Sequence, residues 1–329
     1  MIDRRTVISG VLSLIGATTA ARARTSDRLR RVGILMPYPE SDSEVQERVA
    51  EFRQELRKLG WAEGQNLKID ERWATDNMDR VRAYAAELIN LEPDVIFIAG
   101  RRVVPVVQQQ TRTIPTVAIG VSDPAGQELV ANGARSGGNL TGFGLFAYTI
   151  IGKSLEILKE IAPGIARAAL ICHPDNPATA DISRLFKDAA EALAIEPAVL
   201  LVHQPADIER AIGDFARAPN GAMVFPPDLT LSNHRQLIIA LAARHHLPAF
   251  YFGRIMVRSG GLISYGAVLG DLYRHAAFYV DRILRGEKPG DLPVQQPTRY
   301  ELVINLKTAK ALGLTIPPSI LLRADEVIE

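Results

Sequence analysis

Short apolar segments alternate with amphipathic segments of helical length along most of this chain. Residues 31–37 form an apolar run that ends at a proline, and 41–61 follows with apolar residues at spacings of three and four. That spacing places apolar side chains on one face of a helix, whereas a short continuous apolar run is typical of a strand covered on both faces. Strands separated by helices of about 10–15 residues predict βαβ units and parallel sheets.

The alternation falls into two series. The first ends with the strand predicted at 114–121, and the second begins with the helix predicted at 149–164. Between them lies a stretch rich in glycine, 123–143. A chain of 329 residues is longer than the roughly 250–300 residues at which a single hydrophobic core stops growing. The sequence therefore predicts an α/β protein with two doubly wound lobes.

The first 23 residues are organised like an export signal. Arg4 and Arg5 precede an apolar segment, 6–21, that is too short to cross a bilayer comfortably. Ala21-Arg22-Ala23 then fits the small-x-small pattern of a cleavage site. We expect cleavage near Ala23 and a periplasmic protein, with an uncleaved anchor as the alternative. The arginine pair also resembles a twin-arginine signal, which leaves two export routes open.

Several kinds of chemistry have no support in the sequence. Lys and Arg number 38 against 37 for Asp and Glu, and this balance argues against a nucleic-acid partner, which usually needs a basic face. Cys172 is the single cysteine, so no intramolecular disulfide is expected. His245 and His246 follow a predicted helix without a carboxylate cluster, and the segment 150–154 lacks the first glycine of a phosphate loop. We therefore expect no metal and no cofactor.

Ligands of open parallel sheets bind beyond the carboxyl ends of the strands. In this chain those positions carry prolines, glycines, hydroxyls and aromatic rings, with few acid–base pairs. This composition indicates a pocket that binds a molecule without transforming it. The residues expected to contact a ligand are Pro37, Tyr38, Gly100, Arg101, Ser122, Asp123, Asn176, Asp228, Tyr251 and Tyr265.

The charged residues of this set allow more than one role. Arg101 opens a predicted helix, where a guanidinium beside free N–H groups would hold a carboxylate; the alternative is an arginine in solvent. Asp123 and Asp228 each follow a strand. They are expected to bind an ammonium group or to cap a turn, whereas as an acid–base pair they would indicate a glycosidase-like hydrolase.

Three long segments resemble the ABC-transporter substrate-binding proteins of the tryptophan/tyrosine-binding (TrpX-like) family. They are IPTV with SDPAGQELVANGARSGGNLTGF, the region from LPAFYF through SGGLISYG to KALGL, and the closing RADEVIE. The similarity runs from about residue 31 to the C-terminus. The resemblance implies a type I periplasmic binding-protein fold, in which two doubly wound parallel-sheet lobes are joined by a hinge of three crossovers.

On this resemblance, lobe I would comprise 32–143 with 268–290, and lobe II 146–266 with 294–329. The ligand would bind between them. This chain has Arg101-Arg102 where the family usually carries small residues, which favours a carboxylate-bearing ligand over tryptophan itself. The residues expected to form the hinge are Gly137, Gly138, Asn139, Thr141, Gly142 and Gly266.

The resemblance also implies a function. The chain would be a monomeric extracytoplasmic receptor that delivers an aromatic or branched amino acid, or a related acid, to an ABC permease with its ATPase, and it would not be an enzyme. Two alternatives stay open, namely a ligand module for a signalling partner and a hydrolase that uses Asp123 and Asp228. A DNA-binding regulator of the same fold would need a further module ahead of the first strand, where this chain has about thirty residues that look like a signal.

Overall fold

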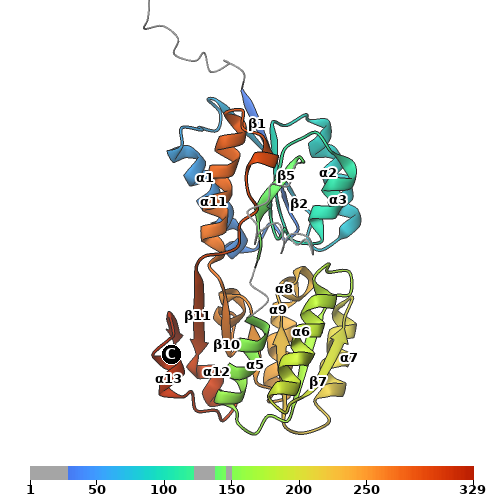
Figure 1. Ribbon diagram of the computed structural model, residues 1–329, viewed down its shortest axis with the longest axis vertical. Coiled ribbons are helices and arrows are strands. Elements are labelled where there is room, and N and C mark those ends of the chain that lie inside the picture. Colours follow the sequence, from blue (N-terminus) through green and yellow to red (C-terminus); the bar gives the residue numbers. More distant parts are fainter. Residues whose placement is uncertain (1–28, 122–137, 146–149) are drawn as a thin grey trace, which may run out of the picture.

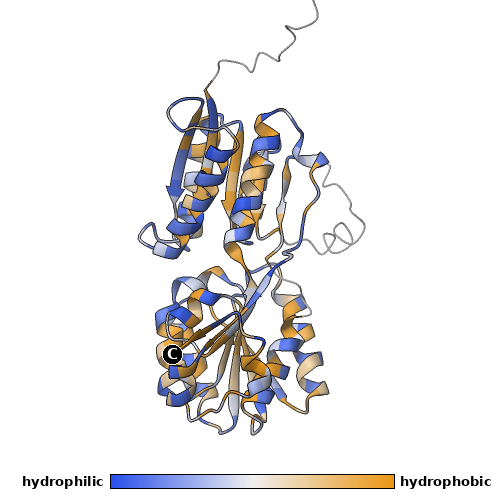
Figure 2. Ribbon diagram, turned by 90° about the vertical axis from the view of Figure 1, so that its left-hand side faces the viewer, coloured by the Kyte–Doolittle hydropathy of each residue, from blue (hydrophilic) through white to orange (hydrophobic). Residues whose placement is uncertain are grey.

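The structure is a computed structural model that describes residues 29–121, 138–145 and 150–329. Two α/β lobes are stacked along the long axis of the molecule (Figure 1). Each lobe has a central sheet with helices on both faces. Apolar residues concentrate on the strands, and hydrophilic residues on the outward-facing parts of the helices (Figure 2). The mixed α/β, two-lobed fold predicted from the alternation of strands and helices is confirmed.

The first sheet has five parallel strands in the order β2-β1-β3-β4-β5. Helices α1 and α11 cover one face, and α2 and α3 cover the other. The strands are β1 (Arg30–Met36), β2 (Leu67–Trp73), β3 (Val95–Ala99), β4 (Thr116–Ile119) and β5 (Leu140–Phe143). The helices are α1 (Ser43–Lys58), α2 (Met78–Asn90), α3 (Val103–Gln110) and α11 (Leu269–Leu284).

The core of the first lobe confirms the helix predicted at 41–61. Val45, Val49, Phe52 and Leu56 recur at spacings of four and three, and all four side chains are buried under α1. The Phe52 ring stacks on Phe97 of β3, with ring centroids 4.5 Å apart. Helix α11 lies beside α1 although more than 200 residues separate them in the chain, so this lobe is closed by a segment that returns from the second one.

The second sheet has seven strands in the order β12-β11-β10-β9-β8-β6-β7. All neighbouring strands are parallel except β10 and β11. The strands are β6 (Arg167–Cys172), β7 (Glu196–Leu201), β8 (Gly221–Phe225), β9 (Ala249–Tyr251), β10 (Ile263–Ala267), β11 (Tyr300–Asn305) and β12 (Glu326–Ile328). The helices are α5 (Ile150–Ile161), α6 (Thr179–Ala192), α7 (Pro205–Phe215), α8 (Leu229–Asn233), α9 (Arg235–Arg244), α10 (Arg254–Arg258), α12 (Leu306–Ala311) and α13 (Pro318–Leu321), with a 3₁₀ turn at Pro289–Asp291.

Two features of the sheets differ from the sequence prediction. The tail contributes β11 and β12, and β11 runs antiparallel to β10, so the second sheet is mixed. Leu140–Phe143, predicted as part of the first crossover, forms β5 at the edge of the first sheet. Gly142 has φ 143° and lies so close to β4 that a Cβ atom would stand 1.9 Å from the Ala118 carbonyl oxygen. Glycine at this position therefore permits close packing of two strands.

Other residues predicted for the hinge also make contacts within one lobe. The Asn139 side chain donates to the Ile114 carbonyl (2.7 Å), and Thr141 Oγ1 donates to the Leu292 carbonyl (2.9 Å), both within the first lobe. Gly266 lies in β10, where a Cβ atom would stand 2.1 Å from the Phe252 carbonyl oxygen. Gly138 directly precedes Asn139, and Gly137 lies outside the described residues. The first crossover thus begins after Phe143.

Candidate ligand-binding site

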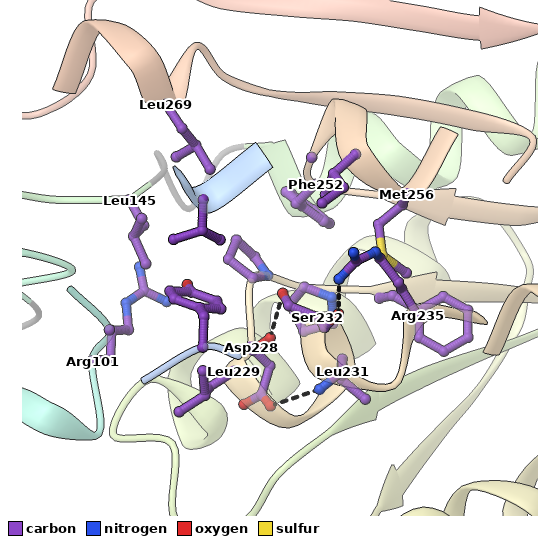
Figure 3. A pocket seen from close by; sticks show the side chains of 18 of the residues that line it. Arg101, Leu145, Asp228, Leu229, Leu231, Ser232, Arg235, Phe252, Met256 and Leu269 are labelled. Carbon is purple, nitrogen blue, oxygen red and sulfur yellow. Dashed lines mark hydrogen bonds between the residues drawn. The ribbon is translucent and has the colours of Figure 1, made fainter. Parts of the chain in front are cut away.

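A pocket lies between the two lobes, where the carboxyl ends of strands from both sheets meet (Figure 3). Its lining comes from the segments after β1 and β3 in the first lobe and after β6, β8 and β9 in the second. Leu145 and Leu269, next to two of the crossovers, complete it. The cavity measures about 90 Å³. The strand ends of open α/β sheets are the expected place for a ligand, and the pocket lies there.

The turn after β3 brings Arg101 to the pocket. Gly100 has φ 97°, a backbone conformation that favours glycine, and the turn packs against Pro37. Arg101 follows directly, lines the pocket and is only 5% exposed. Figure 3 shows its side chain extending toward Leu145. The sequence prediction had left open whether Arg101 is a solvated arginine, and its burial rules that alternative out.

Asp228 and Asn176 meet on the opposite wall. Asp228 follows β8, and its Oδ1 accepts hydrogen bonds from the backbone N–H groups of Thr230 (2.9 Å) and Leu231 (3.3 Å), which caps α8. Its Oδ2 accepts a hydrogen bond from Asn176 Nδ2 (2.9 Å). Both residues are buried, at 6% and 4% exposed. A carboxylate held by three donors serves as a helix cap, and it is poorly placed to act as the general base of a hydrolase.

Tyr38 and Phe252 supply flat apolar surface to the pocket. Phe252 is 7% exposed and packs edge-on against Phe250, with ring centroids 5.4 Å apart. Burial raises the pKa of the Tyr38 hydroxyl, with a smaller opposing effect of Arg48, so the phenol stays neutral and retains its donor. Met256 adds a flexible thioether to the same wall.

Two tyrosines predicted for the site lie elsewhere. Tyr251 is 1% exposed and stacks on Phe225 at 5.2 Å within the core of the second lobe. It precedes Phe252, and successive residues of a strand point to opposite faces, which is why one ring reaches the pocket and the other does not. Tyr265 packs against Tyr300, with ring centroids 5.7 Å apart, beside α5.

Three further predicted residues complete the comparison with the sequence. Pro37 is buried behind the first-lobe wall, and its carbonyl accepts a hydrogen bond from Asn233 Nδ2 across the cleft (3.3 Å). Ser122 and Asp123 lie outside the described residues. Of the predicted ligand contacts in the described part of the chain, the structure brings together Tyr38, Gly100, Arg101, Asn176 and Asp228.

An ion pair that sequence reasoning missed spans the cleft. Arg235 of α9 donates to Asp42 Oδ2 at 2.8 Å, and Asp42 also caps α1 by accepting from the Glu44 and Val45 N–H groups. Arg102 reaches from the first lobe to Thr230 Oγ1 of the second at 3.2 Å. The sequence could have indicated Asp42, because it lies between a strand and a helix as Asp228 does.

Nothing in the described residues suggests a metal centre or a membrane span. Residues 29–121, 138–145 and 150–329 contain no group of three His, Cys, Asp or Glu side chains placed to hold a metal ion. No helix within the same ranges is both long and apolar enough to cross a membrane. Cys172 is buried in the core of the second lobe, and burial raises the pKa of its thiol to about 11.

Two α/β lobes with a buried pocket at their junction are the architecture of a solute-binding protein. A model of the family described as ABC transporter substrate binding protein matches residues 35–328, and this chain belongs to that family. Its fold is the type I periplasmic binding-protein fold, as the sequence resemblance predicted.

Known proteins are similar to this chain in sequence and in structure. The chain is 23% identical over 300 residues to a tyrosine-binding protein of Clostridioides difficile, covering 91% of this chain and 85% of that protein. A conserved domain protein of Vibrio cholerae has a similar structure, with a TM-score of 0.83, 26% identity and coverage of 91% and 100% of the two chains. A domain from Streptococcus pneumoniae in complex with L-Trp has a TM-score of 0.81, 23% identity and coverage of 92% and 100%.

Proposed function

We propose that this protein is an extracytoplasmic receptor of an ABC importer that binds a small carboxylate-bearing ligand between its lobes. The observation that carries the proposal is the buried Arg101 in the interlobe pocket of a chain from this family. A guanidinium offers two parallel N–H donors to a carboxylate, and the bond strengthens where water is excluded. Arg101 also lies two residues before Val103, the first residue of α3, where backbone N–H groups favour an anion.

The rest of the pocket suits an aromatic or branched side chain. Phe252, Met256 and Leu269 provide apolar surface, and the Tyr38 ring adds a flat face with a polar edge. The curated relative binds tyrosine, and the Streptococcus pneumoniae structure contains L-Trp. We therefore propose an aromatic or branched amino acid, or a related acid, as the ligand.

Membership of this family supports the proposed cellular role. After cleavage near Ala23, the mature protein would be periplasmic and monomeric, and it would deliver its ligand to a permease driven by an ATPase. The lobes would open and close about the three connections near Gly144, Val268 and Gln296. No chemical transformation is part of this function, and the engagement of Asp228 as a cap supports that view.

The test is binding by the mature chain that begins at Arg24. A ligand that binds only the folded state raises the melting temperature, by a stabilisation of about 2.7 kcal/mol at a hundredfold excess over Kd. We expect a shift with aromatic or branched carboxylates and none with neutral sugars. Arg101→Met should weaken binding at least tenfold, while Arg217→Met, at a side chain that is 81% exposed on the second lobe, should not. Unchanged affinity in Arg101→Met would remove the proposed role of Arg101.

A further inference from the structure

Arg102 connects the first lobe to the surroundings of a buried histidine in the second. Its Nη1 donates to Thr230 Oγ1 at 3.2 Å, and its Nη2 lies 3.8 Å from Asp175 Oδ2, both across the cleft. The Nδ1 atom of His173 lies 4.0 Å from the same oxygen of Asp175. The guanidinium of one lobe and the imidazole of the other therefore approach one carboxylate oxygen when the lobes are in contact.

The surroundings of His173 favour its neutral form. It is 3% exposed, and its Nδ1 accepts a hydrogen bond from the backbone N–H group of Asp175 at 3.1 Å. A neutral imidazole has one nitrogen without a hydrogen atom, and here that nitrogen is Nδ1. A proton on Nδ1 would remove this acceptor and place a second positive charge near Arg102. Burial, and after it the charge of Arg102, accordingly lowers the pKa of His173.

The charged groups that face His173 come from both lobes. Asp228 and Asp175, which raise its pKa, follow strands of the second lobe, as does His203, which lowers it. These groups move together with His173 when the lobes separate. In the part of the chain that the structure describes, Arg102 is the facing group that belongs to the first lobe. Opening therefore withdraws a positive charge from the histidine, and this change favours its protonated form.

We infer that His173 makes closure of the receptor depend on pH, so that acid favours the open form and releases the ligand. This inference rests on the proposed receptor function and adds a means of regulation to it. The closed form has the lower affinity for the proton, so closing in acid requires His173 to release one. The sign follows from linkage, because closure is undisturbed above the ordinary histidine range near pH 6.5 and weakens as the pH falls through that range.

A second histidine crosses the cleft and has the opposite sign. His234 Nε2 of the second lobe lies 3.6 Å from Asp76 Oδ2 of the first, and protonation of His234 would strengthen this contact. Both side chains are 30% exposed, so water and salt screen the pair. The buried site at His173 therefore has the larger effect, and the protein as a whole should open in acid.

Double electron–electron resonance between two spin labels, one on each lobe, measures the closed fraction of the mature protein without any ligand. The labels are attached to Arg82→Cys on α2 and Arg184→Cys on α6, at exposed side chains, while the native Cys172 is buried. Between pH 8 and pH 5.5 we expect the ratio of closed to open protein to fall about three- to tenfold, where roughly tenfold is the limit for one proton bound only in the open form. Failure of this result is separate from failure of the receptor function, which the thermal-shift experiment tests.

Two histidine variants separate the effect of His173 from other effects of acid. His173→Asn keeps an acceptor for the Asp175 N–H group and removes the titrating ring, so its ratio of closed to open protein should change less than twofold. His234→Asn is the matched control and should retain the full fall. Arg102→Met should flatten the profile as well, and it provides the test if His173→Asn folds poorly. A wild-type ratio that stays constant or rises in acid, or that falls equally in His173→Asn, overturns the inference.

Discussion

The ion pair between Arg235 and Asp42 joins the two lobes directly. We therefore expect that its loss weakens the binding of the ligand. Arg235 belongs to α9 of the second lobe, and Asp42 to the loop before α1 of the first. A receptor that opens to admit its ligand must break this contact and re-form it on closing. Arg235→Met keeps the length and the apolar stem of the side chain but removes the charge, so it should destabilise the closed, ligand-bound form.

The magnitude follows from the geometry. At the observed 2.8 Å, two unit charges attract by about 6 kcal/mol at an effective dielectric constant of about 20, and desolvation of both groups offsets most of this. The Asp42 side chain is 3% exposed and that of Arg235 is 22% exposed, so the pair is screened less than a surface pair worth about 0.2–1 kcal/mol. Asp42 keeps two backbone donors in the variant. We expect a loss of about 1–2 kcal/mol, which weakens binding roughly 5- to 30-fold.

A double-mutant cycle measures the pair itself. Affinities are determined by calorimetry for the wild type, Arg235→Met, Asp42→Asn and the double variant, where Asn retains the cap of α1. The coupling energy should be at least about 1 kcal/mol, and small-angle scattering should show a larger radius of gyration for ligand-free Arg235→Met than for the wild type. Arg217→Met is the control at an exposed arginine of the same lobe. Additive effects, with a coupling below about 0.3 kcal/mol, would refute the idea that this contact stabilises the closed form.

Three further predictions concern the lobes themselves. Gly142→Ala should lower the free energy of unfolding by more than about 2 kcal/mol, because its Cβ would overlap the Ala118 carbonyl, whereas Gly164→Ala, with no atom within 4 Å, should not; equal urea midpoints for the two variants would contradict this. Burial, aided by Arg102, lowers the pKa of His173, so the unfolded chain protonates first as the pH falls below about 6.5 and stability is lost. His173→Asn should therefore show a shallower loss of unfolding free energy between pH 7 and 5, and parallel profiles would exclude the effect. Because burial raises the pKa of the Cys172 thiol to about 11, a disulfide reagent at pH 8 should label it slowly in the native protein and quickly in urea, and rapid native labelling would be inconsistent with that burial.

The fold could be predicted from the sequence because the patterns that indicate strands and helices lie within single short segments. Apolar runs such as Val95–Ala99 and the helical face of α1 appear within single segments, and the structure confirms them. Strands β5 and β12 are three or four residues long and flanked by polar or glycine positions, so they carry no comparable signal. These two strands form by pairing with neighbouring strands: β5 pairs with β4 (Thr116–Ile119), and β12 pairs with β11.

The site was predicted less completely because it depends on side-chain direction and on contacts between distant segments. Tyr251 and Phe252 are adjacent aromatic residues at the end of one strand, and strand periodicity shows that they face opposite ways without showing which one faces the cleft. The core stacking of Tyr251 on Phe225 decides the question. The partner of Arg235 lies 193 positions away in the chain, and no local pattern around residue 235 indicates it.

The use of aspartate on both walls connects the fold to the proposed ligand. In each lobe an aspartate after a strand caps the next helix, and the cap fixes the turn that forms the wall of the pocket. A carboxylate used in this way rigidifies the site at the strand end, and Asp42 at the same time pairs with Arg235 of the opposite lobe. Arg102 and Arg235 each reach from one lobe to the other, to Thr230 and to Asp42 respectively. Arginines of both lobes line the pocket, so an anionic ligand bound there would attract both lobes. Recognition of the anion and closure of the cleft would then be favoured by the same interactions.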